Sequence, residues 1–498
     1  MAPHELSRAR RVFILAICCT SLFIVGLDTT IVNVALPSIG RDLRAGVSGL
    51  QWVIDAYTLV LASLFMLSGS TADRIGRRRT FQAGLALFSV GSLLCSLAPG
   101  LGWLVAFRML QAVGGSMLNP VALSIVTNVF ITPRERARAI GIWGAVFGLS
   151  MALGPVVGGA LVDSVSWRGI FWVNVPVGIA AIILTALYVP ESRAPRARRP
   201  DPVGQVLVIV LLASLIYAFI EGPGRGWTAA AILACFAIAA AALAGLIGYE
   251  RRREDPLIDL RFFHSAPFSG AVAMAICAFA ALGGFLLVNT IYLQDVRGYS
   301  PLLAGLYVLP MAVMSVIFPP VSGILVGRFG TRPPLVIAGI FLTASGVLLT
   351  RLATDTSAAM LVGTYVVFGI GFGFVNPPIT NSTVSGMPTS QAGVAAGITS
   401  TSRQIGSSLG VAVIGSATIS ALHGPFSRDF AAASHAGWWI LTACGAGVLG
   451  LGLLASGSWA HRTAQRTARI LMPATPDGDV QADGAGGAPE DLRAARSD

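Results

Sequence analysis

The chain has 498 residues, of which 54% are hydrophobic and only 11% charged, and its mean hydropathy is +0.75. Globular proteins carry about 25% charged residues, so this composition excludes a water-soluble protein. A net charge of +11 would suggest a nucleic-acid partner in a soluble protein, but membrane proteins keep positive charge in their cytoplasmic loops. We therefore expect an all-α, multi-pass protein of the cytoplasmic membrane whose partner is the lipid bilayer and not nucleic acid.

Apolar stretches long enough to cross a hydrocarbon core of about 30 Å recur along the whole chain. They are bounded by charged residues, Pro or Gly, and they predict fourteen transmembrane helices, at residues 12–36, 49–70, 80–98, 102–127, 137–162, 169–189, 203–221, 228–248, 268–293, 302–326, 333–351, 357–380, 396–420 and 437–459. One set of alternate loops, together with both tails, holds 25 Arg residues, and the other set holds seven. The positive-inside rule therefore predicts that both termini are cytoplasmic.

Two motifs occur twice at nearly the same separation. The segment Gly69–Arg78 is echoed by Gly323–Arg332, 254 residues later, and Gly114–Pro120 is echoed by Gly371–Pro377, 257 residues later. Repeated six-helix units with a site between them are a known transporter plan.

This repeat predicts four regions. They are an N-terminal six-helix half (1–190), a linker with two extra transmembrane helices (191–262), a C-terminal six-helix half (263–460) and a disordered cytoplasmic tail (461–498).

The loop after the second predicted helix carries the most specific motif of the chain. Its members are Gly69, Asp73, Arg74, Gly76, Arg77 and Arg78. Glycine allows a helix to end or to cross a neighbour closely, and the Asp can pair with an Arg or lie at a helix N-terminus. This loop and the twofold repeat resemble the major facilitator superfamily, in which the loop controls conformational change.

The fifth predicted helix carries a second motif, with Gly148, Gly154, Pro155, Gly158 and Gly159. Small residues at this spacing form a flat face for close helix packing, and a proline inside a helix kinks it. The motif resembles the antiporter signature of the same superfamily.

Further stretches resemble the fourteen-span drug:proton antiporters, the EmrB/QacA group. They are Leu27–Pro37, Trp167–Gly178 and the segment Arg108–Gln111, which is similar to the proton-coupling motif of the family but is followed by Ala112 where glycine is usual. The resemblance implies a proton-coupled antiporter that exports drugs or other amphipathic small molecules. It also implies a lipophilic or cationic substrate, protons as the second partner, no cofactor and a monomer.

Three charged residues of the first half lie deep within predicted helices. With a rise of about 1.5 Å per residue, Asp28 is about 13 Å and Asp55 and Arg108 are about 9 Å from the outer surface. Because charges inside a membrane usually face a polar cavity, we expect these three to share one and to couple transport to protons. Which acid carries the proton stays open, and Asp55 could instead be an interfacial residue beside Trp52.

The second half contains no deep acid, but it contains Arg403 within a predicted helix. An Arg at such a depth, like Arg108, can be either a structural clamp on neighbouring groups or part of an ion pathway. The residues do not decide between these two roles.

Three other functions compete with drug export. A dedicated exporter of one endogenous metabolite, such as an antibiotic or siderophore, would have the same motifs. The signature of the fifth helix argues against a nutrient importer. An enzyme is not expected, because the predicted spans hold no Ser/His, Cys/His or metal-binding constellation and no G-x-x-x-x-G-K loop occurs.

Overall fold

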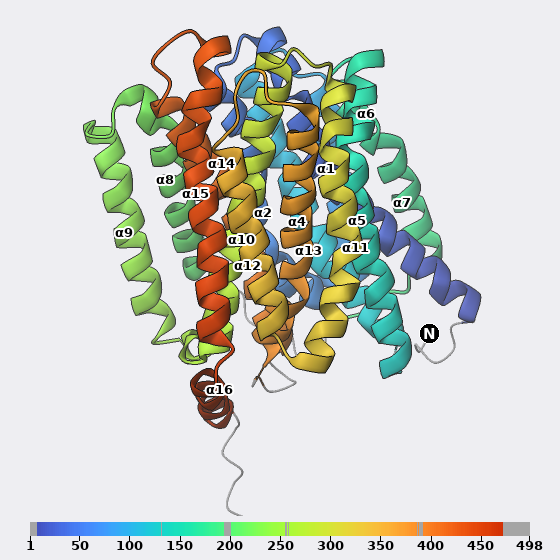
Figure 1. Ribbon diagram of the computed structural model, residues 1–498. Coiled ribbons are helices and arrows are strands. Elements are labelled where there is room, and N and C mark those ends of the chain that lie inside the picture. The colour runs from blue at the N-terminus through green and yellow to red at the C-terminus, as the bar shows by residue number, and fades with distance from the viewer. Residues whose placement is uncertain are drawn as a thin grey trace, which may run out of the picture.

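The computed structural model describes residues 7–130, 132–193, 201–253, 256, 258–385, 387 and 392–471. These residues form helices and connecting loops without any strand. Figure 1 shows most of the helices side by side as one bundle, with the start of α1 and helix α16 near the same end. We call this end the proximal end of the bundle and the opposite end the distal end.

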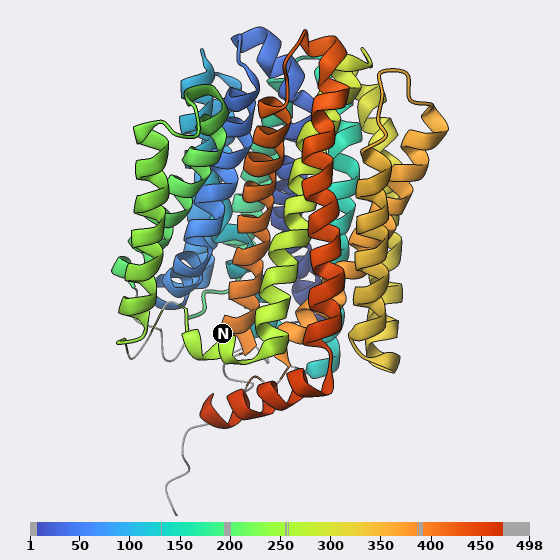
Figure 2. The same cartoon turned by 60° about the vertical axis from the view of Figure 1, so that its left-hand side comes forward.

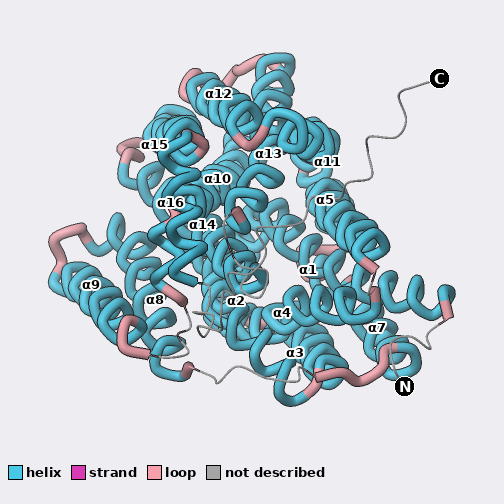
Figure 3. Tube along the Cα trace, turned by 90° about the horizontal axis from the view of Figure 1, so that it is seen from below, coloured by secondary structure: helices cyan, strands magenta, loops and turns pink. Residues whose placement is uncertain are grey.

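Seven helices come first in the chain. They are α1 (Arg8–Leu43), α2 (Val47–Ile75), α3 (Arg77–Ser96), α4 (Leu101–Val129), α5 (Pro133–Ser164), α6 (Gly169–Trp172) and α7 (Asn174–Tyr188). Two more, α8 (Pro202–Arg225) and α9 (Ala230–Glu250), form a hairpin at the edge of the bundle (Figures 2 and 3).

The remaining elements begin with a short 3-10 helix, η2 (Leu260–His264). They continue with α10 (Ala266–Ile291), the π-helical turn η3 (Tyr292–Val296), α11 (Pro301–Phe329), α12 (Arg332–Leu349), α13 (Ala358–Val384), α14 (Ala392–Ser420), α15 (Phe426–Ala455) and α16 (Ser458–Leu471).

Helices α1–α7 and α10–α15 pack in the same pattern. The pairs α1–α5, α2–α4 and α3–α7 contact each other, and so do the corresponding pairs α10–α14, α11–α13 and α12–α15. The sharp turns between α2 and α3 and between α11 and α12 contain Gly76 and Gly330, 254 residues apart, with φ of 130° and 79°. Only glycine adopts such φ values easily, so the repeated motifs make the same turn in both sets of helices.

Among the described residues, twelve helices are long and apolar enough to cross a membrane. Helices α3 and α14 are not among the twelve: α3 begins with three Arg residues, and α14 is rich in Ser, Thr and Gly. Both nevertheless pack along their neighbours α4 and α10. The count of fourteen spans therefore stays a prediction.

The predicted disordered tail is wrong in its first eleven residues. We expected disorder from residue 461, but Ser458–Leu471 form α16, which packs against α10 and η2 at the proximal end (Figure 1). This helix is amphipathic and not apolar, so its sequence pattern differs from that of a membrane span. Residues 472–498 lie outside the described part of the chain.

The two sets of helices meet mainly through α2 with α14 and α5 with α11. A Cβ atom added at Gly305 of α11 would overlap the carbonyl oxygen of Pro155 in α5, and one added at Gly159 of α5 would lie 2.5 Å from Leu302 Cα in α11. Further contacts at the distal end are hydrogen bonds from Gln294 Nε2 to Val34 O, 2.7 Å, and from Leu302 N to Asp163, 3.0 Å.

We expect Gly305→Val to separate α5 from α11, because the overlap involves backbone atoms and close-packed helices leave no room for an added side chain. Spin labels on exposed residues of the distal end, at Arg44 and Asp355 in a cysteine-free background, should then lie farther apart. Gly323→Val on the same helix is the matched control, since a Cβ there meets nothing within 4 Å. An unchanged distance in Gly305→Val would contradict the expectation.

Candidate functional site

An ion pair lies in the middle of the α1–α7 helices. Arg108 Nη1 of α4 is 2.6 Å from Asp28 Oδ2 of α1, and the two residues are 1% and 0% exposed. Removing both charges from water costs several kcal/mol per ion, and the attraction of the pair offsets this cost only where further hydrogen bonds satisfy the remaining atoms.

Those hydrogen bonds come from two side-chain amides. Gln111 Nε2 of α4 and Asn174 Nδ2 of α7 both donate to Asp28 Oδ1, at 2.9 and 3.1 Å. Ser92 Oγ of α3 accepts from both amides, at 3.1 and 3.0 Å, and donates to the Phe171 carbonyl at 3.1 Å. The carboxylate of α1 is therefore bonded to α4 and α7, and Ser92 of α3 connects the two amides that bind it.

The guanidinium of Arg108 is held as firmly as its partner. It donates from Nε to the Val53 carbonyl of α2 at 3.3 Å and from Nη1 to Gln111 Oε1 at 2.8 Å. Its Cζ lies 4.0 Å from the centre of the Tyr57 ring and 5.8 Å from that of Phe171, distances typical of cation–π contacts. Arg108 is thus both a clamp on a carbonyl and the counter-ion of a buried acid.

Asp55 lies elsewhere, so the three charges do not share one cavity in this structure. Helical residues advance by about 100°, and Asp55 is two residues from both Val53 and Tyr57, which contact Arg108. It therefore faces the opposite side of α2, where Oδ1 accepts from Ser408 Oγ of α14 at 2.7 Å. Asp55 is 0% exposed, so its side chain is enclosed by the packed helices.

One oxygen of Asp55 is left over. Within the described part of the chain, Oδ2 is buried and has no hydrogen-bond partner, and the other polar neighbour, Thr58 Oγ1, lies 3.4 Å from Oδ1. An acid without a cation, located where α2 meets α14, differs chemically from the neutralised Asp28.

The residues of the loop motif form two small networks around the α2–α3 turn. Arg77 Nη2, at the start of α3, is 2.9 Å from Asp73 Oδ1 in the last turn of α2, and Arg74 is exposed. The carboxylate of Glu191 accepts from the backbone N–H groups of Arg78 and Arg79, at 3.1 and 3.3 Å, at the N-terminus of α3. Sequence reasoning missed this use of Glu191.

A Cβ at Gly69 would meet nothing within 4 Å, so the close approach proposed for this glycine is absent from this conformation.

The glycines of the α5 motif face two different helices. Cβ atoms at Gly154 and Gly158 would overlap Thr30 and Ile31 of α1, whereas Gly148 and Gly159 face α11. The close packing predicted for this motif is therefore present on both sides of α5. One side contacts the turn of α1 that follows Asp28, and the other contacts the opposite set of helices.

The C-terminal helices carry aromatic rings where the N-terminal helices carry the ion pair. The positions 257 residues after Asp28, Arg108 and Gln111 are Phe285, Tyr365 and Phe368. The ring of Phe285 contacts the other two: its centroid lies 4.6 Å from that of Phe368 and 5.4 Å from that of Tyr365.

The second deep Arg, Arg403 of α14, has no acidic partner within the described residues. Its Nη2 donates to Thr380 Oγ1 of α13 at 2.9 Å, and its Cζ lies 6.0 Å from the centre of the Phe279 ring. These contacts correspond to the clamp alternative, with a side-chain hydroxyl as the group that is held.

The family model described as the Major Facilitator Superfamily matches residues 18–411. The chain belongs to the Major Facilitator Superfamily. This facilitator is 41% identical over 395 residues to the multidrug resistance protein Stp of Mycobacterium tuberculosis, an alignment that covers 79% of this chain and 73% of Stp. It is 38% identical over 397 residues to the tetracenomycin C resistance and export protein of Streptomyces glaucescens, with 79% and 73% covered.

Solved structures share the fold of this facilitator. The crystal structure of a bacterial homolog of the human lysosomal transporter Spinster, inward-facing and occupied, superposes with a TM-score of 0.63 at 17% identity, covering 93% of this chain and 98% of that one. Together with the membrane-spanning helices, these relatives identify this protein as a multi-pass transporter of the cell membrane. The relatives are named for multidrug resistance and for the resistance to and export of an antibiotic.

We expect Asp28→Asn to destabilise the protein by about 3–5 kcal/mol, because it leaves Arg108 buried without a counter-charge. The double variant Asp28→Asn/Arg108→Gln removes both charges and should recover most of this loss. Thermal unfolding in detergent measures both effects.

The control is Asp295→Asn, which breaks the more exposed pair with Arg41 and should cost about 1 kcal/mol or less. A single Asp28→Asn variant as stable as the parent protein would show that the ion pair does not stabilise the fold.

Proposed function

We propose that this protein is a proton-coupled antiporter that exports drugs or other amphipathic small molecules across the cytoplasmic membrane. The observation that carries this proposal is the buried Asp28–Arg108 pair, which is held by Gln111 and Asn174. A carboxylate at this depth needs a functional reason, because burying a charge in a membrane protein is costly. The names of the relatives, which refer to multidrug resistance and export, support the direction of transport.

In this proposal, protonation of Asp28 causes a change in helix packing. A neutral carboxyl no longer attracts Arg108, so the pair separates and the turn of α1 beside it is released. That turn contains Thr30 and Ile31, which pack on the glycines of α5, and α5 in turn packs on α11 at Gly159. A change at Asp28 therefore reaches the interface between the two sets of helices through two close contacts.

Asp55 is the second proposed proton site. Its carboxyl lies where α2 meets α14, with Ser408 as the partner from the opposite half. A protonated carboxyl fits this apolar contact, whereas an ionised one would introduce an unpaired charge and favour separation. Protonation of Asp55 would then close the distal end, and loss of its proton would open it.

The topology proposed here has fourteen spans, both termini in the cytoplasm and a monomeric chain. The uneven distribution of Arg between alternate loops supports it, because it makes the proximal end cytoplasmic. Within it, residues 1–190 and 263–460 are the two halves, 191–262 carry the extra hairpin, and the loop motif at Asp73 and Arg74 controls the change of conformation.

A dedicated exporter of one metabolite is the second candidate. One relative is named for resistance to a single antibiotic, tetracenomycin C, and another is named for multidrug resistance. A pump-deficient host that expresses the chain should become less susceptible to several chemically unrelated drugs, and a proton uncoupler should abolish this protection. Protection against only one compound would favour the dedicated exporter, and protection that survives the uncoupler would contradict proton coupling.

We expect Asp28→Asn to lose proton-coupled efflux by at least tenfold, since the amide cannot exchange a proton. Purified protein in liposomes with an internal pH indicator measures proton movement upon substrate addition. The matched control is Asp42→Asn on the same helix, where the acid forms an exposed pair with Arg168. Full transport by Asp28→Asn at normal expression would overturn the proposed role of this acid.

A further inference from the structure

Helix α16 presents three different faces. Residues advance by about 100° each, and the buried face, toward α10 and η2, consists of Ala460, Ala464, Thr467 and Leu471. Trp459 and Ile470, which are 60% and 56% exposed, lie on one flank, about 90° around the helix from the buried face. Arg462, Arg466 and Arg469 lie on the exposed face roughly opposite the buried one, and the helix has no acidic residue. A basic helix with exposed apolar residues is typical of helices that lie in a membrane interface.

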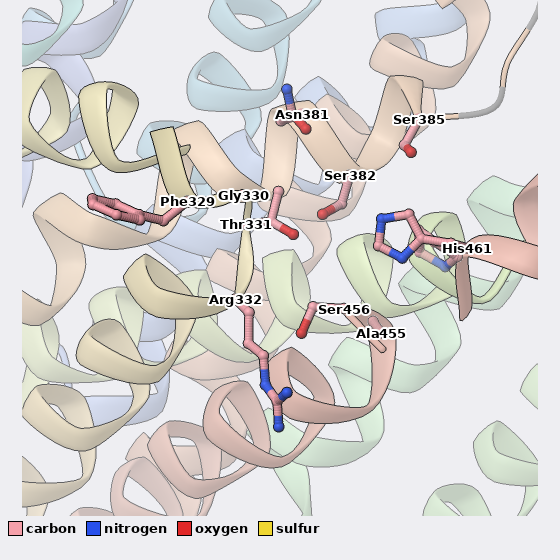
Figure 4. A pocket seen from close by; sticks show the side chains of 11 residues that line it. Phe329, Gly330, Thr331, Arg332, Asn381, Ser382, Ser385, Ala455, Ser456 and His461 are labelled. Carbon is pink, nitrogen blue, oxygen red and sulfur yellow. The ribbon is translucent and has the colours of Figure 1, made fainter. Parts of the chain in front are cut away.

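A cavity of about 300 Å³ opens beside this helix. It lies between α16, the α11–α12 turn and the proximal ends of α10, α13 and α15, and its polar lining residues include Thr331, Arg332, Asn381, Ser382, Ser385 and His461. In Figure 4 the hydroxyls of Thr331 and Ser382 point toward one another, with the ring of His461 to one side, while the long side chain of Arg332 extends past Ser456 in the other direction.

The lining side chains are mostly polar and are not used to hold the helices together. Within the described part of the chain, the side chains of Thr331, Arg332, Asn381 and Ser382 make no hydrogen bond to protein, and His461 uses only Nδ1, toward its own helix. Among the described residues, no carboxylate lines the cavity. Hydroxyl, amide and imidazole groups beside an Arg, without an acid among them, are suited to an anion with several acceptor oxygens, such as a phosphate.

The surroundings of the cavity identify the source of that phosphate. Phe329, which lines the cavity, is 69% exposed, and Leu454, next to the lining residue Ala455, is 68% exposed. Exposed apolar side chains at this level, together with Trp459 of α16, are those expected at the boundary between hydrocarbon and headgroups.

We propose that this cavity binds the phosphate of an anionic phospholipid, with Arg332 as the main cation and the hydroxyls of Thr331 and Ser382 as donors. The acyl chains extend past Phe329, and the three Arg residues of α16 attract the same leaflet. The lipid thereby fixes α16 against the ends of α12 and α13. All lining residues belong to α10–α16, so the site is separate from the interface between the halves and does not depend on the proposed proton coupling.

The test compares purified full-length protein and Arg332→Gln by native mass spectrometry with phosphatidylglycerol or phosphatidylcholine. The parent protein should retain phosphatidylglycerol preferentially, and Arg332→Gln should bind it about tenfold more weakly, as expected for the loss of a charge-assisted hydrogen bond. The matched control is Arg351→Gln, an exposed Arg just beyond the distal end of the same helix α12, which should bind like the parent protein.

A second arm uses inorganic phosphate in lipid-free detergent and measures the shift of the melting temperature. A larger shift with phosphatidylglycerol than with phosphate at equal concentration supports the lipid as the occupant. An equal shift with phosphate alone would overturn the lipid assignment, and equal phosphatidylglycerol binding by Arg332→Gln and the parent protein would overturn the site. The melting temperature of Arg332→Gln without lipid shows whether the variant is folded.

Discussion

The interaction on which the N-terminal helices depend is the ion pair between Asp28 and Arg108. A charge in a membrane interior is tolerated only where its partner and its remaining hydrogen bonds are complete, and four helices contribute to that completeness. The amides of Gln111 and Asn174 donate to the acid, and the hydroxyl of Ser92 accepts from both amides. The packing of α1, α3, α4 and α7 therefore meets at one carboxyl, which is the group that the proposed proton coupling uses.

The two sets of helices have different interactions at corresponding positions of the repeat. Where the first has Asp28, Arg108 and Gln111, the second has the rings of Phe285, Tyr365 and Phe368, with Phe285 stacked on Phe368 and edge-to-face with Tyr365. Aromatic contacts change little with protonation, whereas an ion pair changes strongly. In the proposed mechanism, this asymmetry places the response to protons in the first set. The close glycine contacts of α5 with α1 and α11 connect the two sets.

Much of the site was predictable, and the part that was not has a clear reason. The cost of burial identified Asp28 and Arg108 individually, and helix depth indicated that they lie at similar levels. Depth does not give the direction in which a side chain points, so Asp55 was wrongly grouped with them although it faces α14. Ser92 and Ser408 carried no signal, because a serine in a membrane helix is common and its importance depends on what lies opposite.

The sequence by itself determined the membrane class, the repeated helices and the motifs of the superfamily, because hydropathy, charge bias and glycine spacing act along the chain. Only the tertiary structure decided which charges are paired, which glycines face which helix, and that residues 458–471 form a helix beside a polar cavity. The physical reason is that burial and pairing are properties of surfaces brought together from distant segments. A local sequence pattern shows that a buried charge requires a partner, and only the packed structure shows which residue is that partner.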